Sequence, residues 1–262
     1  MNPRRPSISR SHLNGGKPMH EMPDAIILCG GAGSRLKSVI GDSPKAMAPI
    51  MGHPFLELLL RQLRRHSFTR VILAVGYQKD IIRNYFGTRA FGLHLVYSEE
   101  EMPLGTGGAL GNAAGLMQSD TALVTNGDSY TDLDLSEFLA DHRAAGADVS
   151  LVVVPNDSRG DCGMVSVNLS GRVERYAERE PARQGGHINA GLYLVPKALL
   201  RRIPPRVPIS IENQLLPQWL QEGSCVRAFV SAAECVDIGT PDRYHRAQCV
   251  LAHCEVEGIA SR

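Results

Sequence analysis

Residues 24–36, DAIILCGGAGSRL, decide the fold class of this chain. The apolar run at residues 24–28 is followed by three glycines within four positions, which is typical of a buried strand that opens into a loop. Strand-like runs and helical spacings then alternate as far as residue 146, as they do when helices cover both faces of a parallel sheet. We therefore expect an α/β fold that is Rossmann-like, with a mostly parallel central sheet.

The second half of the chain is richer in strand patterns than the first. We expect one domain over residues 24–253, made of an alternating half at 24–146 and a β-rich half at 147–253. Residues 1–23 are rich in Arg, Ser, Pro and Gly, and we expect a disordered tail there, although its basic residues could instead form a phosphate-seeking arm. A short C-terminal tail is expected at 254–262.

Composition limits the partners of the protein. The 262 residues carry a net charge of +1, so no bulk electrostatic attraction to nucleic acid or to an anionic membrane is expected. No apolar run approaches the roughly 20 residues that a membrane span requires. The six cysteines are scattered and include no C-x-x-C pair, which is typical of a reduced, cytoplasmic protein.

The glycine spacing excludes two common nucleotide-binding motifs. A dinucleotide fingerprint needs a third glycine at position 36, where Leu36 stands, so a dinucleotide-dependent oxidoreductase is excluded. A P-loop needs Gly-Lys-Ser/Thr, but Arg35 is followed by Leu36 and Lys37. Gly30, Gly31 and Gly33 can still present successive backbone N–H groups to phosphate oxygens. A tight turn alone would need only one or two glycines.

The loop and the segment after it match a known pattern. The spacing L-x-G-G-x-G-x-R-L, followed by P-K-x-x-x-P, is filled at every position, from Leu28 through Lys45 to Pro49. It resembles the signature of the sugar-nucleotide pyrophosphorylases, and the resemblance continues through PLGTGGAL, NGD, INAGLY and VDIGTP, over about residues 24–246. It implies a GT-A-like nucleotidyltransferase fold that joins a sugar 1-phosphate to an NTP and releases pyrophosphate. The alternating half would then bind the nucleotide and the β-rich half the sugar phosphate.

The resemblance also implies roles for four charged residues. Arg35 would bind the β- and γ-phosphates, and Lys45 would neutralise the attacking phosphate and the α-phosphate. Asp128 and Asp237 would hold the catalytic Mg²⁺, which prefers few carboxylates together with phosphate oxygens and water. The alternative for Asp128 is a turn-capping role, since Asn-Gly-Asp is also good turn chemistry.

A base preference follows from the residue that occupies the base-reading position of the family, Glu100. A carboxylate can accept both N1–H and N2–H₂ of guanine, so Glu100 favours GTP, unless Glu99–Glu101 form only a solvated acidic run. The nucleotide-binding residues implied by the resemblance are Leu28, Gly30, Gly31, Gly33, Glu100, Gly105 and Thr106.

The sugar side is implied by matches in the β-rich half. Gly163, Glu178, Arg179 and Asn189 occupy the family's sugar-phosphate positions. Arg179 replaces the usual lysine, so the charge is retained but its geometry need not be. Asn189 would hold a sugar hydroxyl, or it could satisfy a buried strand end.

Within the family, the sequence resembles most the D-glycero-α-D-manno-heptose 1-phosphate guanylyltransferases, through the stretches GDSPKAMAPI, PFLELLL, EEEMPLGTGGAL, NGDSY and SIENQLLPQWL. The preferred interpretation is therefore GTP plus this heptose 1-phosphate, with Mg²⁺ as cofactor and a homo-oligomer as a further expectation. Mannose-1-phosphate guanylyl transfer and uridylyl or thymidylyl transfer to a hexose phosphate are the alternatives. A non-catalytic sensor on the same fold would be expected to lack Arg35, Lys45 or the two aspartates.

Overall fold

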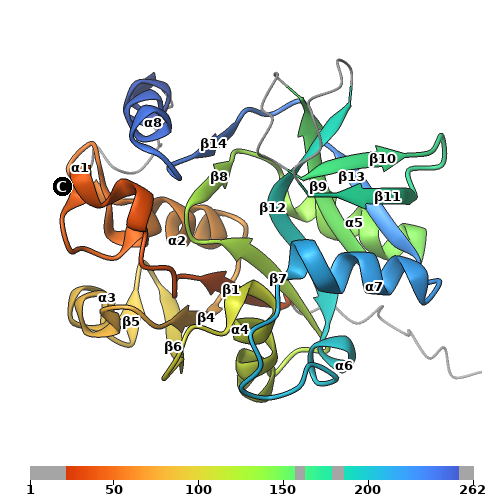
Figure 1. Ribbon diagram of the computed structural model, residues 1–262, viewed down its shortest axis with the longest axis horizontal. Coiled ribbons are helices and arrows are strands. Elements are labelled where there is room, and N and C mark those ends of the chain that lie inside the picture. Colours follow the sequence, from red (N-terminus) through yellow and green to blue (C-terminus); the bar gives the residue numbers. More distant parts are fainter. Residues whose placement is uncertain (1–21, 157–162, 179–185, 254–262) are drawn as a thin grey trace, which may run out of the picture.

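A computed structural model describes residues 22–156, 163–178 and 186–253 (Figure 1). Apart from residues 22 and 23, both expected tails lie outside the described residues. The strands of the large sheet are β1 (Asp24–Leu28), β4 (Arg70–Val75), β5 (Arg89–Ala90), β6 (Leu93–Glu99), β7 (Thr121–Asn126), β9 (Val149–Pro155), β10 (Met164–Val167), β11 (Val173–Ala177), β12 (His187–Pro196) and β13 (Val226–Val230). Two small sheets pair β2 (Pro49–Ile50) with β3 (His53–Pro54) and β8 (Ser129–Thr131) with β14 (Cys235–Asp237).

The α-helices surround this sheet. They are α1 (Lys37–Ile40), α2 (Phe55–Arg65), α3 (Lys79–Phe86), α4 (Gly105–Ala113), α5 (Leu135–Ala145), α6 (Lys197–Leu200), α7 (Leu216–Gln221) and α8 (Pro241–His253). None of the described helices is long and apolar enough to cross a lipid bilayer.

The sheet changes character between the two halves of the chain. Strands β7, β1, β4 and β6 lie side by side and are parallel, with β1 between β7 and β4. Strand β12 pairs antiparallel with β7, and β9 and β10 in turn pair antiparallel with β12. The expected α/β fold is therefore confirmed, and antiparallel pairing is concentrated in the β-rich half.

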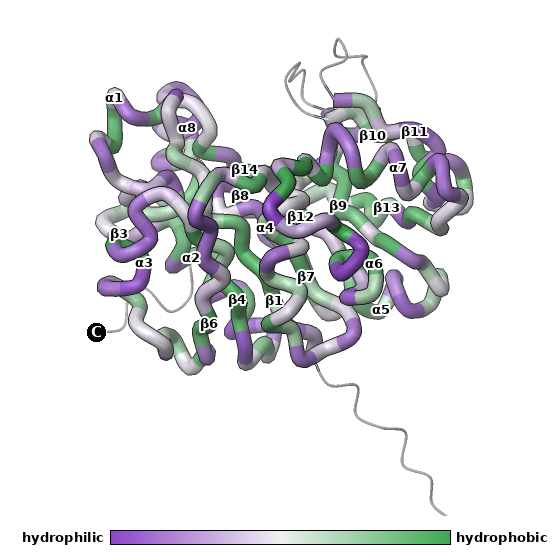
Figure 2. Tube along the Cα trace, turned by 60° about the horizontal axis from the view of Figure 1, so that its bottom comes forward, coloured by the Kyte–Doolittle hydropathy of each residue, from purple (hydrophilic) through white to green (hydrophobic). Residues whose placement is uncertain are grey.

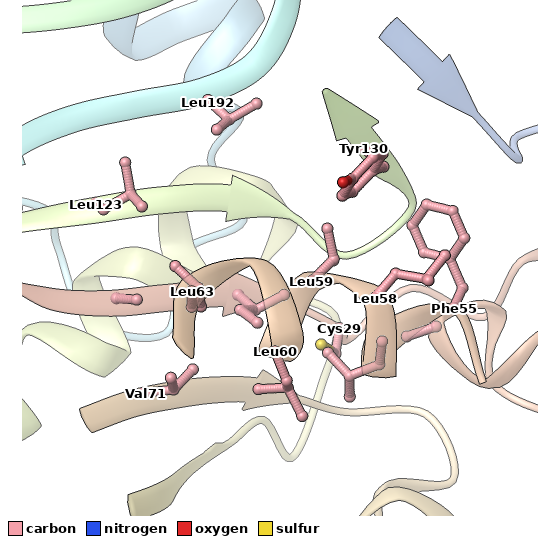
Figure 3. Close-up of a cluster of buried hydrophobic side chains, with 14 of the residues drawn as sticks. Cys29, Phe55, Leu58, Leu59, Leu60, Leu63, Val71, Leu123, Tyr130 and Leu192 are labelled. Atoms are coloured by element: carbon pink, nitrogen blue, oxygen red, sulfur yellow. The ribbon is translucent and has the colours of Figure 1, made fainter. Parts of the chain in front are cut away.

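Helices cover both faces of the sheet, and the alternation of side chains along β1 shows why. Ala25 and Ile27 pack in one buried cluster with side chains of α2, α3, α5 and α8, whereas Ile26 packs in a second cluster with α4, α6 and α7. Figure 3 shows α2 leucines of the first cluster beside Val71, Leu123 and Cys29. Hydrophobic residues accordingly follow the inner strands β1, β4 and β7 in Figure 2. Burial on both faces requires continuous apolar strands rather than alternating ones.

Helix ends follow local signals in the sequence. Asp134 caps α5 by accepting hydrogen bonds from Ser136 N at 2.8 Å and Glu137 N at 3.3 Å. Thr240 Oγ1 accepts a 3.4 Å hydrogen bond from Arg243 N at the start of α8. A π-helical turn at Ile211–Leu215 runs directly into α7. Pro217, in the first turn of α7, has no N–H to donate to that π-helical turn.

A buried ion pair fixes the start of β1. Asp24 is 4% exposed, and Arg70 Nη1 donates to its Oδ1 at 2.7 Å. Gln118 N and Ser119 N donate to the other carboxylate oxygen at 2.6 and 2.9 Å. Burial raises the pKa of Asp24, but the two N–H groups and the guanidinium outweigh it and hold this pKa below its ordinary value.

Asp24→Ala is expected to lower the free energy of unfolding by about 3 kcal/mol at pH 7, because it leaves buried donors without an acceptor. Urea unfolding measures the change. Since the folded-state pKa lies below the ordinary 3.8, the contribution is present above that pH and is lost as the pH falls through the folded-state value. The control is Asp42→Ala, which removes only an exposed pair with Lys37 and should cost less than about 1 kcal/mol. Equal losses in both variants would contradict the role of Asp24.

Candidate active site

A pocket of about 290 Å³ lies where β1, β6 and β7 end. An open α/β sheet binds ligands beyond the carboxyl ends of its strands, so this is the position expected for a binding site. The pocket is lined by Leu28, Cys29, Gly30, Gly31, Lys45, Ala46, Glu100, Pro103, Gly105, Thr106, Ala109, Asn126, Gly127 and Asp128. Eight of the expected site residues line this pocket: Leu28, Gly30, Gly31, Lys45, Glu100, Gly105, Thr106 and Asp128.

The glycine-rich loop packs closely against other residues at two of its positions. A Cβ on Gly30 would lie 3.2 Å from Glu100 Oε1, and one on Gly33 would lie 2.9 Å from Lys45 Cβ. Gly33 also has a φ of +61°, in the left-handed region that favours glycine. Gly33 does not line the pocket itself; its lack of a side chain lets Lys45 pass toward the pocket.

Lys45, Asp128 and Asp237 come together although they are far apart in the sequence. Lys45 Nζ forms an ion pair with Asp128 Oδ2. The pairing of β8 with β14 sets Asp237 opposite Ser129, and Ile238 N donates to Asp128 O at 3.0 Å. A Cβ on Gly239 would lie 3.3 Å from Lys45 Nζ. The small β8–β14 sheet, which the sequence analysis did not expect, is therefore what gathers these charges.

Asp237 also lines a neighbouring hollow of about 110 Å³. Arg243 Nη1 contacts Asp237 Oδ2 at 3.2 Å, and Gly239 N donates to Oδ1. Within the described parts of the chain, no cluster of three or more His, Cys, Asp or Glu side chains is arranged to hold a metal ion. A divalent cation here would take two carboxylates at most from the protein and its other ligands from substrate and water.

Arg35 differs from the other expected catalytic residue in being exposed. It lies on a 3₁₀ turn at Ser34–Leu36, which buried Leu36 anchors to the core. Arg35 does not line the pocket, and no described carboxylate pairs with it. Lys37, one turn away, pairs with Asp42 at 2.7 Å. The guanidinium of Arg35 is thus available to an anionic ligand in a way that Lys37 is not.

Glu100 is separated from its acidic neighbours. Glu99 pairs with Lys79 at 2.6 Å and with Arg83, and Glu101 is exposed, whereas Glu100 lines the pocket. Glu100 Oε2 accepts a 3.0 Å hydrogen bond from Leu104 N. Burial raises the pKa of Glu100, and the Leu104 N–H only partly opposes this. The second carboxylate oxygen points toward Gly30, at the inner wall of the pocket.

The start of α4 is held by a segment that comes from the second half of the chain. Gly107 N and Gly108 N donate to Ile209 O at 2.8 and 3.2 Å, and Ile209 N donates to Leu104 O at 2.8 Å. Gly105 has a φ of +67°, and a Cβ there would lie 2.6 Å from Ile209 O. The glycines of the PLGTGG motif therefore permit a backbone contact between the two halves.

A chain of polar side chains leads from the pocket into the β-rich half. Thr106 Oγ1 donates to Glu212 Oε2 at 2.8 Å, and Tyr193 OH donates to Glu212 Oε1 at 3.2 Å. Asn189 Nδ2 donates to Tyr193 OH at 2.7 Å. Tyr193 is completely buried, which raises its pKa well above its usual value and keeps the hydroxyl protonated. The sequence analysis did not identify Glu212 as a site residue. The one available signal was that it is the only acidic residue between residues 209 and 221.

The expected sugar-binding residues that the structure describes gather around Tyr176. Its hydroxyl donates to Glu178 Oε2 at 2.7 Å and contacts Asn189 Nδ2 at 3.4 Å. A Cβ on Gly163 would lie 1.9 Å from Tyr176 OH, so only glycine fits there. Gly163, Glu178 and Asn189 thus lie together, outside the lining of the main pocket. Arg179 lies outside the described residues.

Comparisons with known proteins identify the family of the chain. A family model described as nucleotidyl transferase matches residues 24–253. The chain belongs to this family. The membership inferred from the glycine-rich motif is therefore confirmed.

Three relatives are similar over most of this chain. It is 36% identical over 239 residues to mannose-1-phosphate guanylyltransferase of Mycobacterium tuberculosis, covering 90% of this chain and 66% of that protein. It is 36% identical over 231 residues to D-glycero-alpha-D-manno-heptose 1-phosphate guanylyltransferase of Aneurinibacillus thermoaerophilus, covering 88% and 99%. The solved structure of HddC from Yersinia pseudotuberculosis complexed with GMP-PN has a TM-score of 0.77 and 34% identity, covering 88% of this chain and 100% of that one.

Gly105→Ala is expected to lower the free energy of unfolding by about 2 kcal/mol, because it adds a Cβ against Ile209 O at a left-handed backbone position. Thermal or urea unfolding measures the loss. Gly115→Ala is the matched control, since no atom lies within 4 Å of the added Cβ, and it should change stability by less than about 0.5 kcal/mol. If Gly105→Ala were as stable as the control, the contact between α4 and Ile209 would not be a constraint.

Proposed function

We propose that the protein transfers a guanylyl group from GTP to a sugar 1-phosphate, with D-glycero-α-D-manno-heptose 1-phosphate as the best candidate, and releases pyrophosphate. The observation that supports this most is the convergence of the glycine-rich loop, Lys45, Asp128 and Glu100 on one pocket. A phosphate cradle, a cation, an acidic metal ligand and a base-reading carboxylate are the groups that such a reaction requires.

In the proposed reaction, an oxygen of the sugar phosphate attacks the α-phosphorus of GTP, and the bond to the β-phosphate breaks. The protein contributes positioning and charge stabilisation. Backbone N–H groups at Gly30 and Gly31 would hold phosphate oxygens. Lys45 would neutralise the α-phosphate and the attacking phosphate. Exposed Arg35 would reach over the β- and γ-phosphates and stabilise the leaving pyrophosphate.

Asp128 and Asp237 are the residues that would hold Mg²⁺. The donor set fits, because Asp128, directly before β8, and Asp237 of the paired strand β14 would leave positions for phosphate and water ligands. When bound, the ion would supply charge neutralisation to the phosphate oxygens. Lys45, already paired with Asp128, holds that carboxylate at the pocket wall.

The proposed preference for guanine rests on Glu100. Its carboxylate lines the pocket beside Gly30, where two acceptor oxygens would suit the adjacent donors of guanine. A uracil carbonyl in the same place would meet an anionic oxygen and would be repelled. The complex of the Yersinia neighbour with GMP-PN supports a nucleotide as a ligand.

Two sugar 1-phosphates are candidates for the second substrate. The relative from Aneurinibacillus, matched over 99% of its length, supports the heptose phosphate. The mycobacterial relative, named a mannose-1-phosphate guanylyltransferase, is equally identical and keeps mannose 1-phosphate as a second candidate. Both substrates would place their hydroxyl groups near Glu178 and the polar side chains of β12.

The deciding experiment measures pyrophosphate release with four NTPs against a panel of sugar 1-phosphates. Turnover is expected to be fastest with GTP, to stop with EDTA and to return with Mg²⁺. Arg35→Ala should lower kcat/KM about 100-fold, because a group that stabilises the leaving charge is lost. Lys37→Ala, which removes a neighbouring exposed cation, is the control and should stay within about twofold of wild type. Unchanged turnover in Arg35→Ala would remove Arg35 from the mechanism.

Glu100→Gln is expected to reduce the preference for GTP over UTP at least about tenfold, since one acceptor of the base becomes a donor. Steady-state kinetics with both nucleotides measure this, with Glu101→Gln as the exposed control. Burial raises the pKa of Glu100, so its carboxylate becomes protonated at a higher pH than that of an exposed glutamate. The KM for GTP should therefore increase as the pH falls toward this raised pKa. A KM for GTP that is independent of pH and of the substitution would refute the base-reading role.

A further inference from the structure

Arg243 of α8 contacts the proposed metal ligand Asp237 and lines the neighbouring hollow rather than the main pocket. Its Nη1 lies 3.2 Å from Asp237 Oδ2, and both side chains are 23% exposed. Water and salt screen such a partly buried pair less than a fully exposed one. Arg243 can therefore affect the electrostatic potential at the proposed metal site without lining the nucleotide pocket.

The packing of α8 keeps Arg243 in this place. The next residue, Tyr244, is buried in the core, and its hydroxyl donates to Pro49 O at 2.5 Å. Thr240 caps the first turn of the helix by accepting a hydrogen bond from Arg243 N. Arg243 thus reaches Asp237 from a helical turn that is fixed at both its cap and its buried side.

The two oxygens of the Asp237 carboxylate have different surroundings. Oδ2 contacts Arg243, whereas Oδ1 accepts a hydrogen bond from Gly239 N. A Cβ on Gly239 would lie 2.7 Å from this Oδ1 and 3.3 Å from Lys45 Nζ. Oδ1 is therefore near the ammonium group that pairs with Asp128, and Arg243 holds the carboxylate by its other oxygen.

Each of the two proposed metal ligands is thus paired with a cation. Lys45 pairs with Asp128 and Arg243 with Asp237, so two positive charges balance two negative ones. A divalent cation is attracted to carboxylates by their charge, and a positive charge a few ångströms away opposes that attraction. A nucleotide would affect the two pairs differently, because Lys45 lines the main pocket and can turn to phosphate oxygens, whereas Arg243 lines the hollow.

We propose that Arg243 is the counter-ion of Asp237, and that it keeps the two aspartates from binding a divalent cation until a nucleotide adds phosphate oxygens. The proposal rests on the proposed function, in which Asp128 and Asp237 are the protein ligands of Mg²⁺. Arg243 is a positioning residue in this scheme, since it acts through Asp237. Metal and nucleotide would enter together, because the phosphate oxygens supply the negative charge that Arg243 balances.

Binding of Mn²⁺ to the full chain without nucleotide tests the proposal. Mn²⁺ takes the same oxygen ligands as Mg²⁺, and electron paramagnetic resonance measures the free ion. Arg243→Gln keeps a donor for Asp237 Oδ2 but removes the charge, so the Kd for Mn²⁺ should fall about tenfold. The matched control is Arg246→Gln, because Arg246 lines the same hollow but pairs with Glu234 at 2.9 Å. Its Kd should stay within about twofold of wild type. An unchanged Kd in Arg243→Gln would overturn the proposal.

Two further variants separate the charge of Arg243 from its packing. Arg243→Lys keeps the positive charge, so its Kd for Mn²⁺ should stay within about threefold of wild type. Combining Arg243→Gln with Asp237→Asn should abolish the gain in affinity, because the gain depends on the carboxylate. A gain shared by Arg243→Lys and Arg243→Gln, or one that persists in the double variant, would overturn the proposal.

The role of the nucleotide is tested by repeating the Mn²⁺ titration with saturating GTP and no sugar 1-phosphate. Wild type and Arg243→Gln should then differ in Kd by less than about threefold, since phosphate oxygens supply the charge that the nucleotide-free site lacks. A difference that GTP leaves unchanged would overturn the proposed dependence on nucleotide.

These outcomes are distinct from a failure of the proposed function. Turnover that needs a divalent cation and Asp237, together with an unchanged Kd for Mn²⁺ in Arg243→Gln, would overturn this inference alone. Turnover that neither EDTA nor Asp237→Asn reduces would overturn the metal site of the proposed function and this inference together.

Discussion

The pairing of β1 between β4 and β7 is the constraint on which the rest of the structure depends. Because these strands and β6 run parallel, their carboxyl ends meet at one edge, and the loops that follow β1, β6 and β7 enclose a single pocket. The backbone approach there is close: a Cβ on Gly127 would lie 2.5 Å from Leu28 O. The buried pair of Asp24 and Arg70 holds the opposite end of the same strands. Charge at one end and glycine at the other therefore determine where β1 lies.

The site is assembled by contacts between segments that are distant in the sequence. Strand β14 brings Asp237 to Asp128, and the segment at Ile209 closes on the start of α4. Glu212 accepts hydrogen bonds from Thr106 and Tyr193, and so links the pocket to the β-rich half through one carboxylate. A π-helical turn carries Glu212, and such turns are frequent at functional sites. The two halves are thus connected by specific polar contacts as well as by the continuous sheet.

Features that depend on local sequence could be predicted, and those that depend on distant pairing could not. The buried strands, the glycine-rich loop and the position of Lys45 follow from residue patterns within a few positions of each other. Strands β8 and β14 are only three residues long, and each is formed because the other is present. The engagement of Asn189 likewise arises from the packing of β7 against β12, and so does the burial of the Asn126 side-chain oxygen, which has no partner among the described residues.

The contact between Ile209 and α4 would also favour one orientation of the proposed nucleotide substrate. A free helix N-terminus attracts anions, but Ile209 O already occupies the N–H groups of Gly107 and Gly108. The amides of the glycine-rich loop, close to Lys45, would then attract the triphosphate more strongly than the start of α4 does. The uncharged base would lie against the wall formed by α4 and Glu100. An internal backbone hydrogen bond would thereby give the pocket a polarity, with its anion-attracting amides at one end only.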